Sequence, residues 1–124
     1  MDRRRLSTLL VHAGVRHLEG AVVPPVFLSA NYLQQDVETY GAVRYLRLSN
    51  SPQQLALATK LAAIEGAEDA LPLASGMAAI STAMLSVLSA GDHLLIQANT
   101  YGGTTTLVQH DLHRLGISAT FVDP

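Results

Sequence analysis

The chain has 124 residues, of which 48% are hydrophobic and 15% are charged, so it is a globular chain that forms one domain or part of a larger one. Its net charge of −2 argues against a general nucleic-acid binder, and the lack of cysteine excludes both a disulfide framework and a thiolate metal site. The apolar run after Arg3–Arg5 is cut short by His12 and Arg16 and is too short to span a membrane, which makes a cytoplasmic protein the default.

The first fifty residues predict an extended amino-terminal arm that carries one short helix. Residues 6–14 favour this helix, with Ser7 or Thr8 as its cap and Gly14 as its end. Two prolines and a run of apolar residues then predict extended chain at residues 20–32. Because this segment is too apolar for a free tail, we expect it to lie against its own domain or another subunit.

A second helix is predicted after a loop-like stretch at residues 41–50. Ser51 is its cap, Pro52 occupies its first position and Gly66 ends it. A stripe of leucine, isoleucine and alanine side chains indicates that this helix is a packing element.

The middle of the chain predicts a βαβ unit with a turn of small residues after each strand. The apolar run at residues 70–74 predicts the first strand, and residues 93–97 predict the second. Residues 77–88 between them predict a helix that is apolar nearly all round and is therefore expected to be buried. The turns, Ser75–Met77 and Tyr101–Thr104, are expected at the carboxyl ends of the strands, where α/β proteins bind ligands.

One more helix and one more strand complete the predicted α/β chain. The helix runs from Gly103 to Leu115 with an apolar stripe of Val108, Leu112 and Leu115, and residues 117–122 form the third strand. Parallel sheets need both faces covered and usually contain more strands than this. We therefore expect either a fragment of a larger domain or a chain that partners complete.

The turn after the first strand has the properties of an anion site. Ser75 is a good N-cap, and Gly76 places no side chain between a ligand and the backbone. The first amides of the following helix lack internal partners and lie at the positive end of its dipole. No acidic residue lies between Leu71 and Asp92. A phosphate would fit here, and the same residues would also serve simply to cap a buried helix.

Seven motifs share the order and spacing of one enzyme family. They are Thr8–Gly14, Gly20–Val26, Tyr45–Arg47, Leu61–Ala67, Ala74–Ile80, Ala90–His93 and Tyr101–Thr104. Together they resemble the amino-terminal part of the Cys/Met-metabolism family of pyridoxal 5'-phosphate (PLP) enzymes. Its members include cystathionine γ-synthases, cystathionine lyases, methionine γ-lyases and O-acetylhomoserine sulfhydrylases. The resemblance covers essentially the whole chain but only an early part of the family's length.

The resemblance implies a fold. It predicts an α/β architecture, the first part of the PLP-dependent transferase fold type I large domain, with an incomplete, mostly parallel sheet. Residues 1–50 would form the arm and residues 51–124 the first βαβαβ portion of the large domain. In the family, the first strand (here residues 69–74) does not pair with the second. The second (residues 93–97) pairs in parallel with the third (residues 118–122).

The resemblance also implies site residues. The amides of Gly76 and Met77 would bind the PLP phosphate, and Tyr101 would stack on the pyridine ring and take part in catalysis. Tyr45 and Arg47 would reach the neighbouring site across a subunit interface, in a homo-oligomer that is a dimer of dimers. A guanidinium suits this role because its planar donors grip phosphate oxygens in pairs. The substrate would be a small amino acid, with no metal, nucleic acid or membrane involved.

PLP chemistry needs two further groups that the chain does not provide. Lys60 is its only lysine and lies on the packing helix, outside the family's Schiff-base motif, and the acid that protonates the pyridine nitrogen is also missing. We therefore expect the amino-terminal fragment of a trans-sulfuration enzyme, inactive alone, whose parent performs β/γ-elimination or γ-replacement on sulfur amino acids or activated homoserine. Gly103 stands where methionine γ-lyases tend to have cysteine, which weighs against that member.

Two non-catalytic functions compete with this interpretation. A stand-alone phosphate or nucleotide binder is weaker, because neither a Gly-x-Gly-x-x-Gly motif nor a P-loop lysine follows a strand. An assembly stub without the lysine would persist by associating with full-length relatives through its apolar strand edges. The histidines have no convincing metal-ligand spacing.

Overall fold

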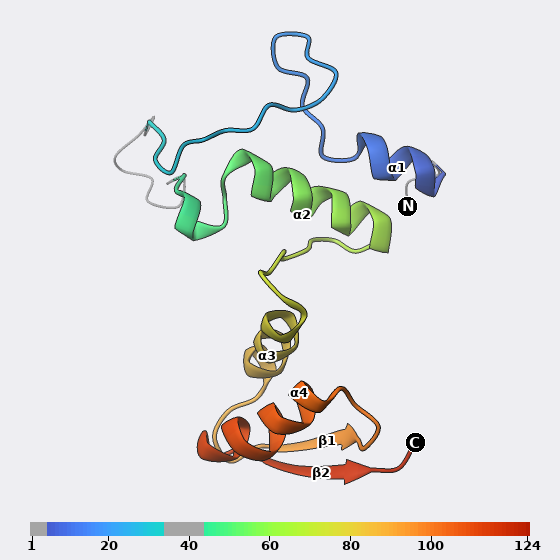
Figure 1. Cartoon of the computed structure of the whole chain (residues 1–124), viewed down its shortest axis with the longest axis vertical. Coiled ribbons are helices and arrows are strands. Elements are labelled where there is room, and N and C mark those ends of the chain that lie inside the picture. The colour runs from blue at the N-terminus through green and yellow to red at the C-terminus, as the bar shows by residue number, and fades with distance from the viewer. Residues whose placement is uncertain (1–4, 34–43) are drawn as a thin grey trace. The chain divides into compact units, whose positions relative to one another are not determined.

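The computed structural model describes residues 5–33 and 44–124, which belong to two compact units (Figure 1). The first unit is Met1–Pro72 and the second is Leu73–Pro124. The first contains α1 (Leu6–His12), the short 3₁₀ helix η2 (Leu46–Leu48) and α2 (Pro52–Glu65). The second contains α3 (Gly76–Val87), β1 (His93–Gln97), α4 (Gly102–Thr106), the π-helical segment η3 (Leu107–Leu112) and β2 (Ser118–Val122).

Helix α1 forms where the sequence predicts it, but its cap differs. Its N-cap is Arg5, whose carbonyl accepts hydrogen bonds from the amides of Thr8 and Leu9 at 2.8 and 3.1 Å, and no side chain caps it. The predicted cap at Ser7 or Thr8 is therefore wrong, because both residues already lie in the first helical turn. The helix ends at His12, two residues before Gly14.

Helix α2 confirms the predicted start and stop signals. Ser51 and Gln54 form a capping box, in which the Gln54 amide donates to Ser51 Oγ and the Ser51 amide donates to Gln54 Oε1 at 3.1 Å. Pro52 occupies the first helical position, where a missing amide costs nothing. Gly66 ends the helix in the left-handed conformation, with φ of 65°.

The loop after α1 packs closely on α2. Leu9 and Ala13 are buried on one side of this contact and Ala62 on the other. Gly14 has a φ of 72°, and a side chain there would collide with the backbone carbonyl of Ala56. Glycine is therefore required at position 14 both by its backbone conformation and by the close approach of α2.

The predicted extended chain at residues 20–32 begins with a turn instead, in which the Ala21 amide donates to the Leu18 carbonyl at 2.9 Å and Gly20 has a φ of 78°, whereas residues 24–29 contain no turn or bend. Two backbone carbonyls anchor this segment: Phe27 accepts from the Gln53 side chain at 2.9 Å, and Ala30 accepts from the Leu46 amide at 3.0 Å. Several of its large apolar side chains are nevertheless exposed, including Val26 and Leu28. That these exposed side chains are covered by another subunit or another part of the domain remains a prediction.

In the second unit, β1 and β2 are parallel, hydrogen-bonded neighbours. The register runs from His93 opposite Ser118 to Gln97 opposite Val122, which confirms the predicted pairing. One face of this ladder packs on Val108, Leu112 and Ile117, which are at most 2% exposed and form the core of the unit. Figure 1 shows α4 and the helical turns after it covering that face.

Residues 69–74 do not form the predicted first strand. No strand among the described residues pairs with them, and the Ala70 amide instead donates to the carboxylate of its neighbour Asp69 at 2.8 Å. A β-strand is defined by its partner, so an isolated extended run does not become one. The prediction that residues 69–74 do not pair with the second strand, β1, is confirmed.

Two further helix predictions need correction. Helix α3 was predicted to be buried, but it contains no buried residue, and Val87 near its end is 77% exposed. Within this unit, Met84 and the neighbouring Leu88 are the residues of this region that pack on the core. Leu115 was placed on the buried stripe but is 53% exposed. The π-helical winding of residues 107–112 changes the number of residues per turn, which moves Leu115 off that face.

We predict that hydrogen exchange will separate the ladder from the run that precedes α3. The ladder-bonded amides of β1 and β2 should exchange slowly, whereas the amides of Leu71, Leu73 and Ala74 should exchange at nearly the rate of a free peptide, because no strand among the described residues pairs with this run. Mass-spectrometric or NMR exchange on the intact chain measures both. Slow exchange across residues 69–74 would mean that a partner strand has been found there.

Candidate functional site

The amino end of α3 leaves two backbone donors unused. Ser75 caps the helix by accepting from the Ala78 amide at 3.1 Å through its hydroxyl and from the Ala79 amide at 3.0 Å through its carbonyl. The amides of Gly76 and Met77 come before these in the first turn, and neither donates to any residue that the structure describes. They are two of the four donors that every helix leaves without an internal acceptor.

The space in front of these amides is open. Gly76 is exposed, and no heavy atom lies within 4 Å of the position that a Cβ would occupy. No acidic side chain lies in the first turn of α3. The free amides and the positive end of the helix dipole together favour an anion, such as the terminal phosphate of a ligand.

Tyr101 is held by its backbone while its ring stays accessible. Its carbonyl accepts from the amides of Thr104 and Thr105 at 2.8 and 3.1 Å, which makes it the N-cap of α4. The preceding loop is tied to the ladder, because the Ala98 amide donates to the Val122 carbonyl at 2.7 Å. The tyrosine side chain is 72% exposed, so an aromatic face is available to a ligand.

The structure brings Tyr101 next to the amino end of α3. A Cβ built on Gly103 would lie 2.7 Å from the Tyr101 Cε1 atom and 3.1 Å from the Met77 Sδ atom, so the tyrosine ring and the methionine side chain meet over that glycine. The buried Thr104 adds a weak contact from its hydroxyl to the same sulfur at 4.0 Å. Three of the five predicted site residues, Gly76, Met77 and Tyr101, therefore share one place.

Tyr45 and Arg47 lie together in the first unit. The Tyr45 amide donates to Asn50 Oδ1 at 2.8 Å, and the Arg47 guanidinium carbon lies 4.8 Å from the centroid of the Tyr45 ring, within cation–π range. Arg47 is exposed, and no acidic side chain among the described residues pairs with it. The guanidinium N–H groups of Arg47 are accessible to solvent, and the contact with the Tyr45 ring restricts the conformations of the Arg47 side chain.

The sequence predicted the Tyr101–Thr104 turn but not the contacts that Gly103 and Thr104 make in it. Thr104 is 5% exposed and contacts Met77, although it looks like an ordinary turn residue in the sequence. The double glycine of the Tyr101–Thr104 turn was the available signal, because adjacent glycines indicate that another group approaches the backbone closely.

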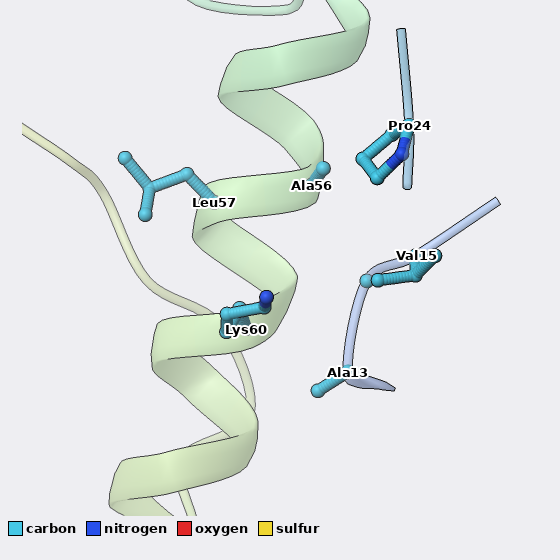
Figure 2. A pocket seen from close by; sticks show the side chains of 7 residues that line it. Ala13, Val15, Pro24, Ala56, Leu57 and Lys60 are labelled. Atoms are coloured by element: carbon cyan, nitrogen blue, oxygen red, sulfur yellow. The ribbon is translucent and has the colours of Figure 1, made fainter. Parts of the chain in front are cut away.

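Lys60 lies in the first unit, on α2. Its ammonium donates to the carbonyl of Val11, near the end of α1, at 3.5 Å. It lines a small open cavity of about 200 Å³, together with mainly apolar residues of α2 and of the segment after α1. Figure 2 shows these side chains around Lys60. The lining residues are Ala13, Gly14, Val15, Pro24, Ala56, Leu57 and Lys60. A lysine at a helix carboxyl end satisfies a carbonyl that would otherwise lack a donor.

The structure supplies no metal centre in the described residues, where no three histidine or acidic side chains come together. Within the same part of the chain, no helix is both long and apolar enough to cross a bilayer.

The profile of the family described as "Cys/Met metabolism PLP-dependent enzyme" matches residues 7–124. The chain is 45% identical over 120 residues to cystathionine beta-lyase MetC of Bacillus subtilis, covering 95% of this chain and 30% of the relative. It is 35% identical over 132 residues to an L-methionine gamma-lyase of Fusobacterium nucleatum, covering 99% of this chain and 33% of the relative. The chain thus spans about a third of the length of these curated relatives.

A similar fold occurs in a solved relative. The crystal structure of cystathionine gamma-lyase from Lactobacillus plantarum, complexed with L-serine, matches with a TM-score of 0.86 at 30% identity. The match covers 97% of this chain and 31% of that structure. The α/β fold class predicted from the sequence is therefore confirmed.

We predict that Lys60 will not carry a covalent pyridoxyl group in stoichiometric yield. Its amine is held at the Val11 carbonyl and faces a cavity lined mainly by apolar residues that offers no second cation for a phosphate. Incubation of the intact chain with PLP, reduction with borohydride and peptide mass mapping measure the yield. Free lysine methyl ester at matched amine concentration controls for non-specific reaction, and a full equivalent on Lys60 would contradict the assignment.

Proposed function

The chain belongs to the Cys/Met metabolism family of PLP-dependent enzymes, and we propose that it supplies the amino-terminal part of a trans-sulfuration enzyme. Such an enzyme would act by β/γ-elimination or γ-replacement on sulfur amino acids or activated homoserine. The cofactor of the family is pyridoxal 5'-phosphate. The observation that carries the proposal is the pair of free amides at Gly76 and Met77 beside the accessible Tyr101 ring.

These residues fit a flat, phosphorylated ring. The amides of Gly76 and Met77 would hold the phosphate, and the face of Tyr101 would lie against the heterocycle, which contributes roughly 0.5–1.5 kcal/mol beyond burial. When bound, PLP supplies an electron sink for charge that develops on the substrate. The Tyr101 hydroxyl has no hydrogen-bond partner among the described residues, so it would be free to donate a hydrogen bond to a bound ligand.

Tyr45 and Arg47 are proposed to act on the phosphate of a neighbouring subunit. Stacking of the guanidinium on the Tyr45 ring, at 4.8 Å, reduces the freedom that Arg47 would lose on binding. Its planar donors would then grip phosphate oxygens in pairs. The arrangement requires a homo-oligomer, which we propose to be a dimer of dimers in the cytoplasm.

Catalysis needs an amine that this chain does not offer at the site. Lys60, the single lysine of the sequence, lies on α2, where its ammonium donates to the Val11 carbonyl. We therefore propose that the chain binds the phosphate and orients the ring, and that by itself it does not complete the reaction. A stand-alone phosphate-binding module is not favoured, because the relatives are named as cystathionine and methionine lyases.

Substituting Gly76 by proline tests the phosphate site directly. Proline removes the amide donor at the first helical position, where its ring is tolerated. Ser75 already has the extended backbone that must precede a proline, with φ of −158° and ψ of 162°, and the space around Gly76 is open. We expect G76P to weaken binding of pyridoxamine 5'-phosphate by about tenfold to a hundredfold, the value of one charge-assisted hydrogen bond.

The matched control is G76A, which adds a side chain but keeps the amide. Fluorescence or calorimetric titration should show G76A binding far more tightly than G76P, and circular dichroism should show equal helix content. Equal affinities for G76A and G76P would refute the role of this amide. Failure of the unmodified chain to bind the ligand at all would refute the proposed function.

Mixing two defective variants tests whether Arg47 serves the neighbouring site. R47A alone and G76P alone should each lose binding, because every site of either homodimer lacks one group. In a mixed dimer, one of the two sites combines an intact Arg47 with an intact Gly76 amide. Random exchange should thus restore binding at about a quarter of the sites, measured by titration after dissociation and reassociation. Absence of any recovery, in a mixture shown by mass spectrometry to contain mixed dimers, would place Arg47 outside that site.

A further inference from the structure

Thr104 is a buried polar residue to which the proposed function assigns no role. It is 5% exposed and occupies the third position of α4, whose N-cap is Tyr101. A threonine hydroxyl in a helical turn usually bonds to a nearby amide or carbonyl of its own backbone segment. Among the residues that the structure describes, the Thr104 hydroxyl makes no such bond, and its partner is the sulfur of Met77 on α3, at 4.0 Å.

The contact between this hydroxyl and the thioether contributes little to the stability of the fold. A thioether is a weak acceptor, and a hydroxyl that is buried without a strong acceptor keeps most of its desolvation penalty. Valine has nearly the same shape as threonine and would fill the same volume without that penalty. The hydroxyl at position 104 is therefore one of the buried polar groups that stability does not explain.

The same contact joins the two parts of the candidate site. Met77 carries one of the free amides in the first turn of α3, and Thr104 lies in the first turn of α4, three residues after Tyr101. The far end of α3 packs on the core through Met84 and the neighbouring Leu88, but no residue of α3 is buried. The position of the amino end of α3 beside the tyrosine turn thus depends on partly exposed contacts such as that of Met77.

We infer that Thr104 is a positioning residue, whose hydroxyl holds the Met77 side chain. It thereby sets the separation between the free amides of α3 and the ring of Tyr101. A ligand that carries both a phosphate and a flat ring needs this separation, because it must reach both elements at once, whereas a phosphate alone needs only the amides. The role toward such a ligand rests on the proposed function, and the hold on Met77 does not.

Three variants separate the hydroxyl from the rest of the side chain. T104V removes the hydroxyl and keeps the shape, whereas T104S keeps the hydroxyl and removes the methyl group. T106V makes the same change as T104V at an exposed threonine of the same helix, and so controls for the helix propensity of valine.

The first measurement follows the Met77 side chain without any ligand. Carbon-13 labelling of the methionine methyl groups gives three signals, from Met1, Met77 and Met84. The methyl carbon shift depends on rotation about the bond between the sulfur and the γ-carbon. We expect T104V to move the Met77 signal, because the side chain loses its partner, and we expect T104S and T106V to leave it near its original position.

Met84 reports on the core, because it packs on the buried cluster of Val108, Leu112 and Ile117. A shift at Met77 with an unchanged Met84 signal in T104V is the expected result. A Met77 signal that T104V leaves in place, or that T104S or T106V moves as far, overturns the inference. So does a shift at Met84 as large as that at Met77, because the hydroxyl would then support the core.

The second measurement tests the consequence for a ligand, using pyridoxamine 5'-phosphate and inorganic phosphate as probes. We expect T104V to raise the Kd for pyridoxamine 5'-phosphate about twofold to tenfold relative to T106V, with T104S restoring the affinity and with no comparable change for inorganic phosphate. Equal losses for both probes, or an equal loss in T104S, would overturn the role toward the ligand. If the unmodified chain binds neither probe, the proposed function fails, and the methyl spectra alone decide the hold on Met77.

Discussion

The two unpaired amides at the amino end of α3 are the constraint on which the site depends. The two longest helices among the described residues differ in how the amides of their first turns are satisfied. Helix α2 closes its amino end with a capping box between Ser51 and Gln54 and with a proline that has no amide. Helix α3 uses its Ser75 hydroxyl on the third amide and leaves Gly76 and Met77 without acceptors among the described residues. The first turn of α2 thus leaves only the Gln53 amide without an acceptor among the described residues, whereas the first turn of α3 leaves two amides for water or an external acceptor.

The parallel ladder brings an aromatic ring to that helix end. After β1 ends at Gln97, the Ala98 amide continues the ladder by donating to Val122, so the loop leaves from the carboxyl end of both strands. Tyr101 then starts α4 as its N-cap, and packing of Val108 and Leu112 holds the helical segment on the sheet. A ligand site at this edge is a general property of α/β folds. Here one hydrogen-bonded loop and a small core would position the proposed site.

Local signals predicted most of the elements, and tertiary effects account for the rest. The serine cap, the proline and Gly66 predicted α2 fully, because each acts within one turn of the helix. The same reasoning failed where a distant partner decides, because residues 69–74 lack a pairing strand and α3 has no buried residue despite its apolar sequence. Leu115 differs for a local reason, because the π-helical winding before it turns it off the core face. For the candidate site, the proposed anion-binding turn was predicted from Ser75 and Gly76, whereas the proximity of the Tyr101 ring to Met77 over Gly103 is visible only in the structure.

The amide protons of α3 test the central claim most directly, because they are the groups said to hold the phosphate. Nitrogen-15-labelled chain is titrated with pyridoxamine 5'-phosphate, and the Gln53 amide in the first turn of α2 serves as an internal reference. The account predicts that the Gly76 and Met77 protons move downfield and saturate together, while the Gln53 proton stays in place. Saturation of ligand binding with Gly76 and Met77 unmoved, or with Gln53 moving equally, would show that the phosphate binds elsewhere.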